Sequence, residues 1–292
     1  MKKIILPTDF SPEAAKAIPV AAQLARLFDA DLHLIHVLPP VLTDYMPRIH
    51  TTDTQYHRAL DLVGQAFDKI RALPCLSKLR VQTHVLTAIE PVGLLDDKRF
   101  ADADLLVMTS TGASGLKETL IGSNAERLIR QATIPVLVLK NTPDHLAVKT
   151  VVFASDFEDH YDSSIDFLNT LFDGLAHPAI HLLFVNTISR FVPTHEIKPR
   201  MESFADRYAL VNYTLNQQDE VDVETGVLAF AREKKADLIV LGTHGRQGLW
   251  HLLQGSIAED IANHALIPVL TLPLQAEHVP TVFSDGFVVT PV

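Results

Sequence analysis

Short apolar runs alternate along the chain with segments in which apolar residues recur at helical spacing. Lys3–Thr8 and Leu32–Leu38 are two such runs, and their length and composition predict buried strands. Between them a helix is predicted, with Ser11 as N-cap and Pro12 at its first position, and Pro19 should bend it. Its apolar stripe consists of Ala14, Ala17, Ile18, Ala21, Leu24, Ala25 and Phe28.

The same alternation continues to residue 272. Further strands are predicted over Leu79–Thr87, Asp104–Thr109, Val136–Lys140, Thr150–Ala154, Ile180–Asn186, Ala209–Leu215, Asp237–Leu241 and Val269–Leu272. Further helices are predicted over about 54–73, 90–100, 124–131, 162–175, 198–205, 223–234 and 257–264. Strands that are apolar throughout and alternate with helices indicate parallel sheets covered on both faces. With right-handed crossovers, the result is a doubly wound, Rossmann-like α/β fold.

The chain also contains an internal repeat. Gly112–Leu116 returns as Gly245–Leu249, 133 positions later, and Thr8–Phe10 returns as Ser155–Phe157, 147 positions later. Two offsets in one order indicate a duplicated domain whose copies differ in length by about 14 residues, the difference between the offsets. This period is too long for a solenoid repeat. The chain therefore holds two copies of one five-stranded domain.

Composition agrees with this organisation. The 292 residues are sufficient for two domains with separate cores, 47% are hydrophobic, and mean hydropathy is +0.16. No apolar run reaches the ~18–20 residues needed to cross a bilayer. The single cysteine, Cys75, fits a reducing compartment. The predicted parts are a first domain over 1–141, a second domain over 149–274 and a C-terminal extension over 275–292.

The net charge of −10, without a long Lys/Arg cluster, argues against nonspecific nucleic-acid binding. Several chemistries lack their motifs: the sequence has no P-loop and no Gly-x-Ser-x-Gly elbow. His33 and His36 are three residues apart on a strand, so they point to opposite faces and cannot chelate one metal. No catalytic residue and no metal ligand is assigned.

A glycine motif in the second copy carries the candidate chemistry. Gly242-x-x-Gly245, nine residues and then Gly255-Ser256 begin where a strand ends and finish where a helix starts. Doubly wound folds bind ligands at that edge. Glycines let backbone N–H groups approach phosphate oxygens, and the helix start favours an anion. His244 and Arg246 add donors.

A second interpretation stays open. Ser256-x-x-Glu259 and its twin Ser123-x-x-Glu126 are also capping boxes, so these serines could simply start helices. In that interpretation the glutamates would repel a phosphate that came close to the loop. The spacing alone does not separate the two interpretations.

The combined pattern resembles the universal stress protein family in its tandem, two-domain form. The matching segments are Leu6–Ser11, Leu34–Val37, Ala103–Met108, Gly122-Ser123, Pro135–Val138, Ala236–Arg246 and Gly255–Glu259. The resemblance implies parallel sheets with strand order 3-2-1-4-5 and a cytoplasmic stress-response protein. It also implies pairing through the fifth strands, here within one chain, and leaves open a further homodimer.

Some members of the family bind ATP and others have lost this property, so the resemblance implies ATP or another adenine nucleotide as ligand, with Mg²⁺ only as its companion. In the binders an aspartate after strand one contacts adenine, a backbone group on strand two contacts the base, and the glycine motif holds ribose and phosphates. In the second copy these positions are Asp156, Val185, Gly242, His244, Gly245, Arg246, Gly255, Ser256 and Ile257. In the first copy they are Pro7, Asp9, Val37, Gly112, Gly122, Ser123 and Asn124.

The two copies depart from the binder pattern in different ways. In the first, Thr109 stands in place of the first glycine and Ala113 in place of Arg246. The second has all its glycines but lacks the proline before Ser155-Asp156. The second copy is therefore the favoured site. Three functions follow: a nucleotide-binding regulatory module without fast turnover, a ligand-free interaction scaffold, and, least favoured, a weak ATPase.

Overall fold

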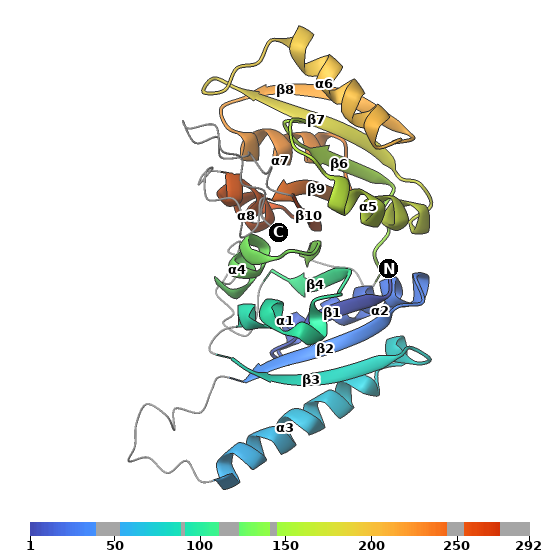
Figure 1. The fold of residues 1–292 in the computed structure, drawn as a ribbon, viewed down its shortest axis with the longest axis vertical. Coiled ribbons are helices and arrows are strands. Elements are labelled where there is room, and N and C mark those ends of the chain that lie inside the picture. Colours follow the sequence, from blue (N-terminus) through green and yellow to red (C-terminus); the bar gives the residue numbers. More distant parts are fainter. Residues whose placement is uncertain (39–52, 89–90, 111–122, 141–144, 244–253, 275–292) are drawn as a thin grey trace, which may run out of the picture.

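The computed structural model describes residues 1–292 except 39–52, 89–90, 111–122, 141–144, 244–253 and 275–292 (Figure 1). Within these described ranges, ten strands form one sheet that runs through both halves of the chain. The first half of the chain contains β1 to β5, and the second half contains β6 to β10.

The first half alternates strands and helices as its hydrophobic pattern predicts. Its strands are β1 (Lys3–Pro7), β2 (Asp31–Leu38), β3 (Val81–Thr87), β4 (Leu105–Thr109) and β5 (Val136–Leu139). Its α-helices are α1 (Pro12–Ala15), α2 (Ala17–Leu27), α3 (Asp53–Arg71) and α4 (Ser123–Gln131). Short 3₁₀ turns cover Pro74–Leu76, Pro91–Asp96 and Lys98–Phe100, so the helix expected over 90–100 is 3₁₀ rather than α.

The second half repeats this order. Its strands are β6 (Thr150–Ala154), β7 (Ala179–Thr187), β8 (Tyr213–Glu220), β9 (Leu238–Thr243) and β10 (Val269–Pro273). Its helices are α5 (Asp162–Gly174), α6 (Thr194–Arg207), α7 (Val223–Glu233) and α8 (Gln254–His264).

The strand order is β3-β2-β1-β4-β5-β10-β9-β6-β7-β8, so each half has the order 3-2-1-4-5. Among the described strands, neighbours pair in parallel except at the centre, where β10 runs antiparallel to β5 with Leu270 opposite Leu137. The two predicted sheets are thus one continuous sheet, and the fifth strands pair within the chain. In Figure 1 the halves lie one above the other, with α4 and α8 side by side next to this junction.

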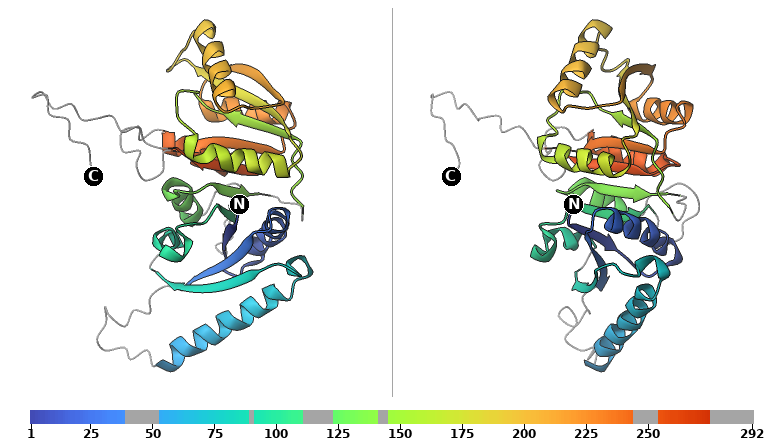
Figure 2. Two further views of the ribbon diagram at one scale, coloured as in Figure 1. Left: turned by 45° about the vertical axis from the view of Figure 1, so that its right-hand side comes forward. Right: turned by 90° about the vertical axis from the view of Figure 1, so that its right-hand side faces the viewer.

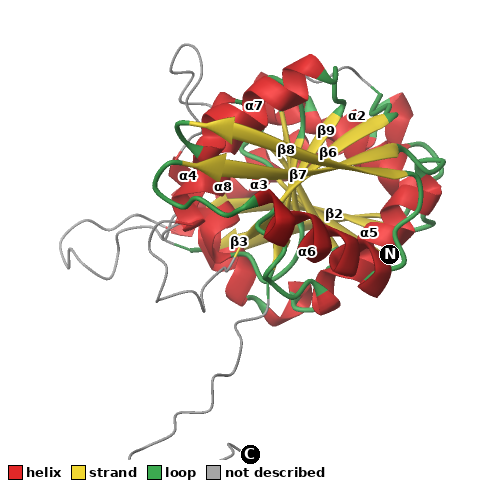
Figure 3. Cartoon of the chain, turned by 90° about the horizontal axis from the view of Figure 1, so that it is seen from above, coloured by secondary structure: helices red, strands yellow, loops and turns green. Residues whose placement is uncertain are grey.

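Helices cover both faces of the sheet, as the apolar strands require. Figure 2 shows α2 and α5 on one side of the junction, and Figure 3 shows the twisted strands between the helical layers. One buried apolar cluster lies under α2, α3, α5 and α6, and a second lies under α4, α7 and α8. Among the described residues, no helix is long and apolar enough to cross a membrane.

The duplication extends to individual hydrogen bonds. In the first half, Asp104 Oδ2 accepts from the backbone N–H groups of Lys2 and Lys3, at 2.6 and 2.8 Å. In the second half, Asp237 Oδ2 accepts from the N–H groups of Lys149 and Thr150, at 2.8 and 3.0 Å. In each half one aspartate thus fixes the start of the first strand. The duplication therefore includes contacts that hold the fold together.

Two expectations about local structure have different outcomes. Pro19 does interrupt its helix: lacking an N–H, it cannot continue the ladder, and the chain divides at Lys16 into α1 and α2. The strand expected over 209–215 is wrong in position, because β8 covers Tyr213–Glu220. This strand is polar because it lies at the open edge of the sheet, where little of it is buried.

Candidate functional site

In the second half, the chain makes a tight polar turn directly after β6. Ser155 Oγ accepts from the N–H of Phe157 at 2.9 Å, and Asp156 Oδ1 accepts from the N–H of Glu158 at 3.1 Å. Phe157 has a φ of 61°, a conformation that costs a non-glycine residue about 1–2 kcal/mol. Its ring packs edge-on against that of Phe204, with the ring centroids 5.1 Å apart. This packing contributes to offsetting the cost of the backbone conformation.

The first half forms the same turn after β1. Thr8 Oγ1 accepts from the N–H of Phe10 at 3.0 Å, Asp9 Oδ1 accepts from the N–H of Ser11 at 2.9 Å, and Phe10 has a φ of 63°. Phe10 packs edge-on against Phe67 at 5.0 Å. Both candidate aspartates therefore have a structural task, because each one holds the turn that follows the first strand of its half.

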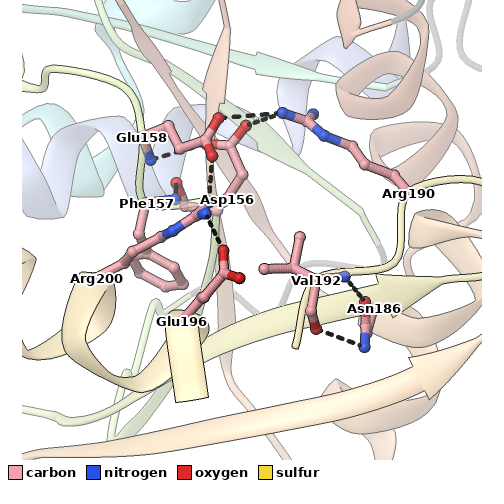
Figure 4. A network of polar contacts seen from close by, with 9 residues as sticks. Asp156, Phe157, Glu158, Asn186, Arg190, Val192, Glu196 and Arg200 are labelled. Carbon is pink, nitrogen blue, oxygen red and sulfur yellow. Dashed lines mark hydrogen bonds and ion pairs between the residues drawn. The ribbon is translucent and has the colours of Figure 1, made fainter. Parts of the chain in front are cut away.

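Asp156 lies in a network of charged side chains (Figure 4). Its Oδ2 is 3.5 Å from the guanidinium of Arg190, which also contacts Glu158 at 3.2 Å. Arg200 pairs with Glu158 as well. Burial, followed by the negative charge of Asp159, raises the pKa of Asp156 above its ordinary value, while Arg190 works in the opposite direction. A desolvated carboxylate of this kind favours a hydrogen-bond donor that reaches it.

The segment that carries Arg190 is held by polar contacts. Asn186, at the end of β7, donates to the carbonyl of Val192 at 3.2 Å and accepts from its N–H at 2.9 Å (Figure 4). The N–H of Arg190 donates to the carbonyl of Thr187 at 3.2 Å. Arg190 is therefore positioned beside Asp156 by the backbone and not only by its charge.

Gly242, near the end of β9, has a neighbour that the sequence did not indicate. A methyl group built at Gly242 would clash with Tyr161 Oη and would lie 3.0 Å from its Cζ and 2.8 Å from Leu274 Cδ1. Tyr161 is 1% exposed, and its hydroxyl donates to Ser155 Oγ at 3.2 Å. The absence of a side chain at Gly242 thus makes room for a tyrosine of the same half.

The side chains at the positions expected on strand two are partly buried and pack against the second apolar cluster. A methyl group at Gly226 in α7 would lie 2.5 Å from Val185 Cγ1, so the Val185 side chain faces α7. Val37 packs in the corresponding way on the second apolar cluster. Pro7 ends β1. For Val185 and Val37 only the backbone is left to meet a base, as the resemblance implies.

The helices after the glycine loops start as expected or slightly earlier. α4 begins at Ser123, followed by Asn124, and α8 begins at Gln254, so that Gly255, Ser256 and Ile257 lie in its first turn. The loop positions Gly112, Gly122, His244, Gly245 and Arg246 lie outside the described residues.

Glu259 is turned away from the capping role that its spacing suggests. Its two carboxylate oxygens accept from Nε and Nη2 of Arg130 in α4, at 2.7 and 2.5 Å. The Glu259 side chain is 7% exposed. The pair joins the two halves, and the arginine neutralises a charge that would otherwise oppose an anion near α8.

Sequence reasoning missed Tyr161 and Arg190, and only the first had a detectable signal. With the offset of 147, α2 and α5 end at equivalent residues, Leu27 and Gly174, and Tyr161 corresponds to Ala14. The second half has the larger residue of this pair, Tyr161, and the smaller residue of the pair Thr109 and Gly242. Comparing the two pairs would have indicated that a large side chain at the first position goes with a glycine at the second. Within the described ranges, no three His, Cys, Asp or Glu side chains are grouped as a metal site requires.

The model of the universal stress protein family matches residues 1–140 and 215–273, which is more than half of the chain. The chain belongs to the universal stress protein family. A universal stress protein of Mycolicibacterium smegmatis is 27% identical over 289 residues, covering 92% of this chain and 96% of the relative. Another, MJ0531 of Methanocaldococcus jannaschii, is 30% identical over 139 residues, which cover 48% of this chain and 82% of the relative.

The fold of this universal stress protein has full-length counterparts. The crystal structure of a universal stress protein from Archaeoglobus fulgidus aligns with a TM-score of 0.65 at 18% identity, covering 93% of this chain and 98% of the other. The tandem arrangement thus occurs in a solved structure of the family, and the match supports the architecture alone.

Proposed function

We propose that this universal stress protein is a cytoplasmic stress-response module that binds an adenine nucleotide, such as ATP or AMP, chiefly in its second half and without fast turnover. The observation that carries the proposal is Asp156. Its carboxylate is fixed by its own turn, desolvated, and placed after β6, where the strand order of the half reverses. In open α/β sheets this is where ligands bind.

The neighbouring groups suit the parts of such a ligand. The Asp156 carboxylate accepts from an exocyclic amine, as adenine provides, and the backbone of Val185 lies on the adjacent strand. The first turn of α8 offers backbone N–H groups and a positive dipole end to phosphates. Arg130 holds the Glu259 carboxylate toward α4. A crystal structure of another universal stress protein contains cAMP. In this chain, the groups named above are the ones proposed to contact a nucleotide.

Isothermal titration with ATP, ADP and AMP tests the proposal on folded protein freed of co-purified nucleotide. We expect binding by the wild-type protein and a loss of at least about tenfold in Asp156→Asn, equivalent to about 1.4 kcal/mol. The matched control is Asp9→Asn, which removes the same charge from the same turn of the first half and should change the affinity less than about twofold. No heat with any of the three nucleotides would refute nucleotide binding.

One observation favours the second candidate, a ligand-free interaction scaffold. Ile188, Phe191 and Val221 are 90%, 70% and 75% exposed at the carboxyl ends of β7 and β8. Thr187 and Glu220 are register partners, so Ile188 and Val221 leave the sheet side by side. A scaffold predicts no nucleotide in a boiled extract of the purified protein and a melting temperature that ATP leaves unchanged.

A further inference from the structure

The carboxyl ends of β6 and β9 form the crevice in which the second half would hold its ligand. These strands are neighbours, with Ala154 opposite Leu241. The helices that follow them depart to opposite faces, because α5 packs in one apolar cluster and α8 in the other. This divergence creates the opening that doubly wound folds use for binding.

In this protein a buried side chain of the same half lies between those two strand ends. Tyr161 Oη donates to Ser155 Oγ at the end of β6 and lies against Gly242 at the end of β9. The tyrosine therefore contacts both strands that border the opening. It is fully buried, and burial raises the pKa of its hydroxyl, so that the group stays protonated and able to donate.

Three aromatic side chains pack against the ring of Tyr161. Its centroid lies 5.3 Å from that of Phe153, 5.4 Å from that of Phe204 and 6.5 Å from that of Tyr208. The backbone N–H of Tyr161 donates to Tyr208 Oη at 2.8 Å. The conformation is therefore set at both the main chain and the side chain.

The two halves differ at this point in a reciprocal way. The first half has Ala14 in place of Tyr161 and Thr109 in place of Gly242. A phenol ring beside a glycine in one half thus corresponds to a methyl group and a threonine in the other. The glycine that makes the second half look like a binder is accounted for by packing.

We propose that Tyr161 is a plug, a side chain of the protein that fills the nucleotide crevice of the second half and sets its affinity. The inference rests on the proposed function, because it concerns the same site. An adenine nucleotide enters fully only when the phenol ring leaves its place between Ser155 and Gly242. Phe204 and Tyr208, which contact the ring, also line a surface pocket of about 480 Å³ beside α6.

Titration of ATP into the wild-type protein and three Tyr161 variants tests the plug. We expect Tyr161→Ala to bind ATP at least tenfold more tightly than wild type, because the crevice is then open. Tyr161→Leu should show a gain in the same direction while keeping apolar contacts with Phe153 and Phe204, which protects against loss of the fold. Tyr161→Phe is the matched control: it keeps the ring and should stay within about twofold of wild type.

The location of the effect is tested by adding Asp156→Asn to Tyr161→Ala, which should abolish the gain, whereas adding Asp9→Asn should leave it. Near-ultraviolet circular dichroism establishes that each variant is folded. Equal ATP affinity in wild type, Tyr161→Leu and Tyr161→Ala would overturn the plug while leaving the proposed function intact. No heat in any of these proteins would overturn the proposed function itself, and the plug with it.

Discussion

Replacing Gly242 by alanine tests whether packing against Tyr161 accounts for this glycine. Glycine inside a strand is less stable than alanine by roughly 0.5–1 kcal/mol, so the substitution alone should stabilise the protein. The added methyl group, however, meets Tyr161 Oη at a distance that real Cβ atoms do not show. Overpacking of this kind costs typically about 1–3 kcal/mol, which exceeds the gain. We therefore expect Gly242→Ala to lower the free energy of unfolding by about 1–2 kcal/mol.

The clash can be separated from other effects by a double-mutant cycle. Tyr161→Phe removes the atom nearest to the new methyl group and leaves Cζ at 3.0 Å. In that background Gly242→Ala should cost about 1 kcal/mol less than in wild type, a coupling typical of residues in contact. Urea unfolding of the four proteins, followed by circular dichroism, measures the coupling.

A control and a contrary result complete this test. At Gly64, in α3, a methyl group would meet no atom within 4 Å apart from the backbone of its own helix, so Gly64→Ala should raise stability by up to about 1 kcal/mol. If Gly242→Ala behaves like Gly64→Ala, or if its cost is the same with and without the Tyr161 hydroxyl, then Tyr161 is not the reason for the glycine.

Three further predictions concern charged and titratable groups. Arg130→Met should cost about 2–3 kcal/mol in urea unfolding, because it leaves Glu259 buried and unpaired while Arg130 itself is 60% exposed; a cost below 0.5 kcal/mol would contradict this. His33 and His84 hydrogen-bond through Nδ1 and Nε2 at 3.0 Å, and burial lowers the pKa of each. Below about pH 6.5 the unfolded chain therefore takes up protons that the folded chain resists, so the melting temperature should fall from pH 7 to 5, and less steeply in His33→Gln. An equal slope in the variant would exclude the pair as the cause. Burial lowers the pKa of Lys140 to about 8, so acylation followed by mass spectrometry should label it with a midpoint near pH 8, well before lysines that titrate near 10.4.

Local sequence patterns predicted those parts of the fold that depend on local rules. The duplicated order of strands and helices agrees with the structure, and the helix expected to bend at Pro19 divides at Lys16. The junction of the fifth strands is also present, but the family resemblance implied it and local patterns did not. The misplaced strand was Tyr213–Glu220, an edge strand whose outer side needs no apolar partner. Its sequence carries little hydrophobic signal, so periodicity placed the start of the strand four residues too early and its end five residues too early.

The site was harder to predict because its residues come from distant segments. The glycine spacing points to the carboxyl edge of the sheet, where Gly242 lies near the end of β9, but nothing near Gly242 in the sequence reveals that Tyr161 lies against it. In the same way, Ser256-x-x-Glu259 fits a capping box, whereas Glu259 pairs with Arg130, 129 positions away. A short motif cannot distinguish a glycine kept for a ligand from one kept for a neighbouring side chain.

The antiparallel contact between β5 and β10 has a consequence for how the two halves evolve. Only residues 140–149 separate β5 from β6, so each half meets the other at the effective concentration of a tethered partner, on the order of millimolar for short linkers. Neither half needs to bind a copy of itself. Because β5 and β10 already pair with each other, these strands are not available to a half from another chain. A substitution in one half is never imposed on the other, as it would be in a homodimer. The covalent link thus allows the pair Tyr161 and Gly242 to exist in one half and Ala14 and Thr109 in the other within every molecule.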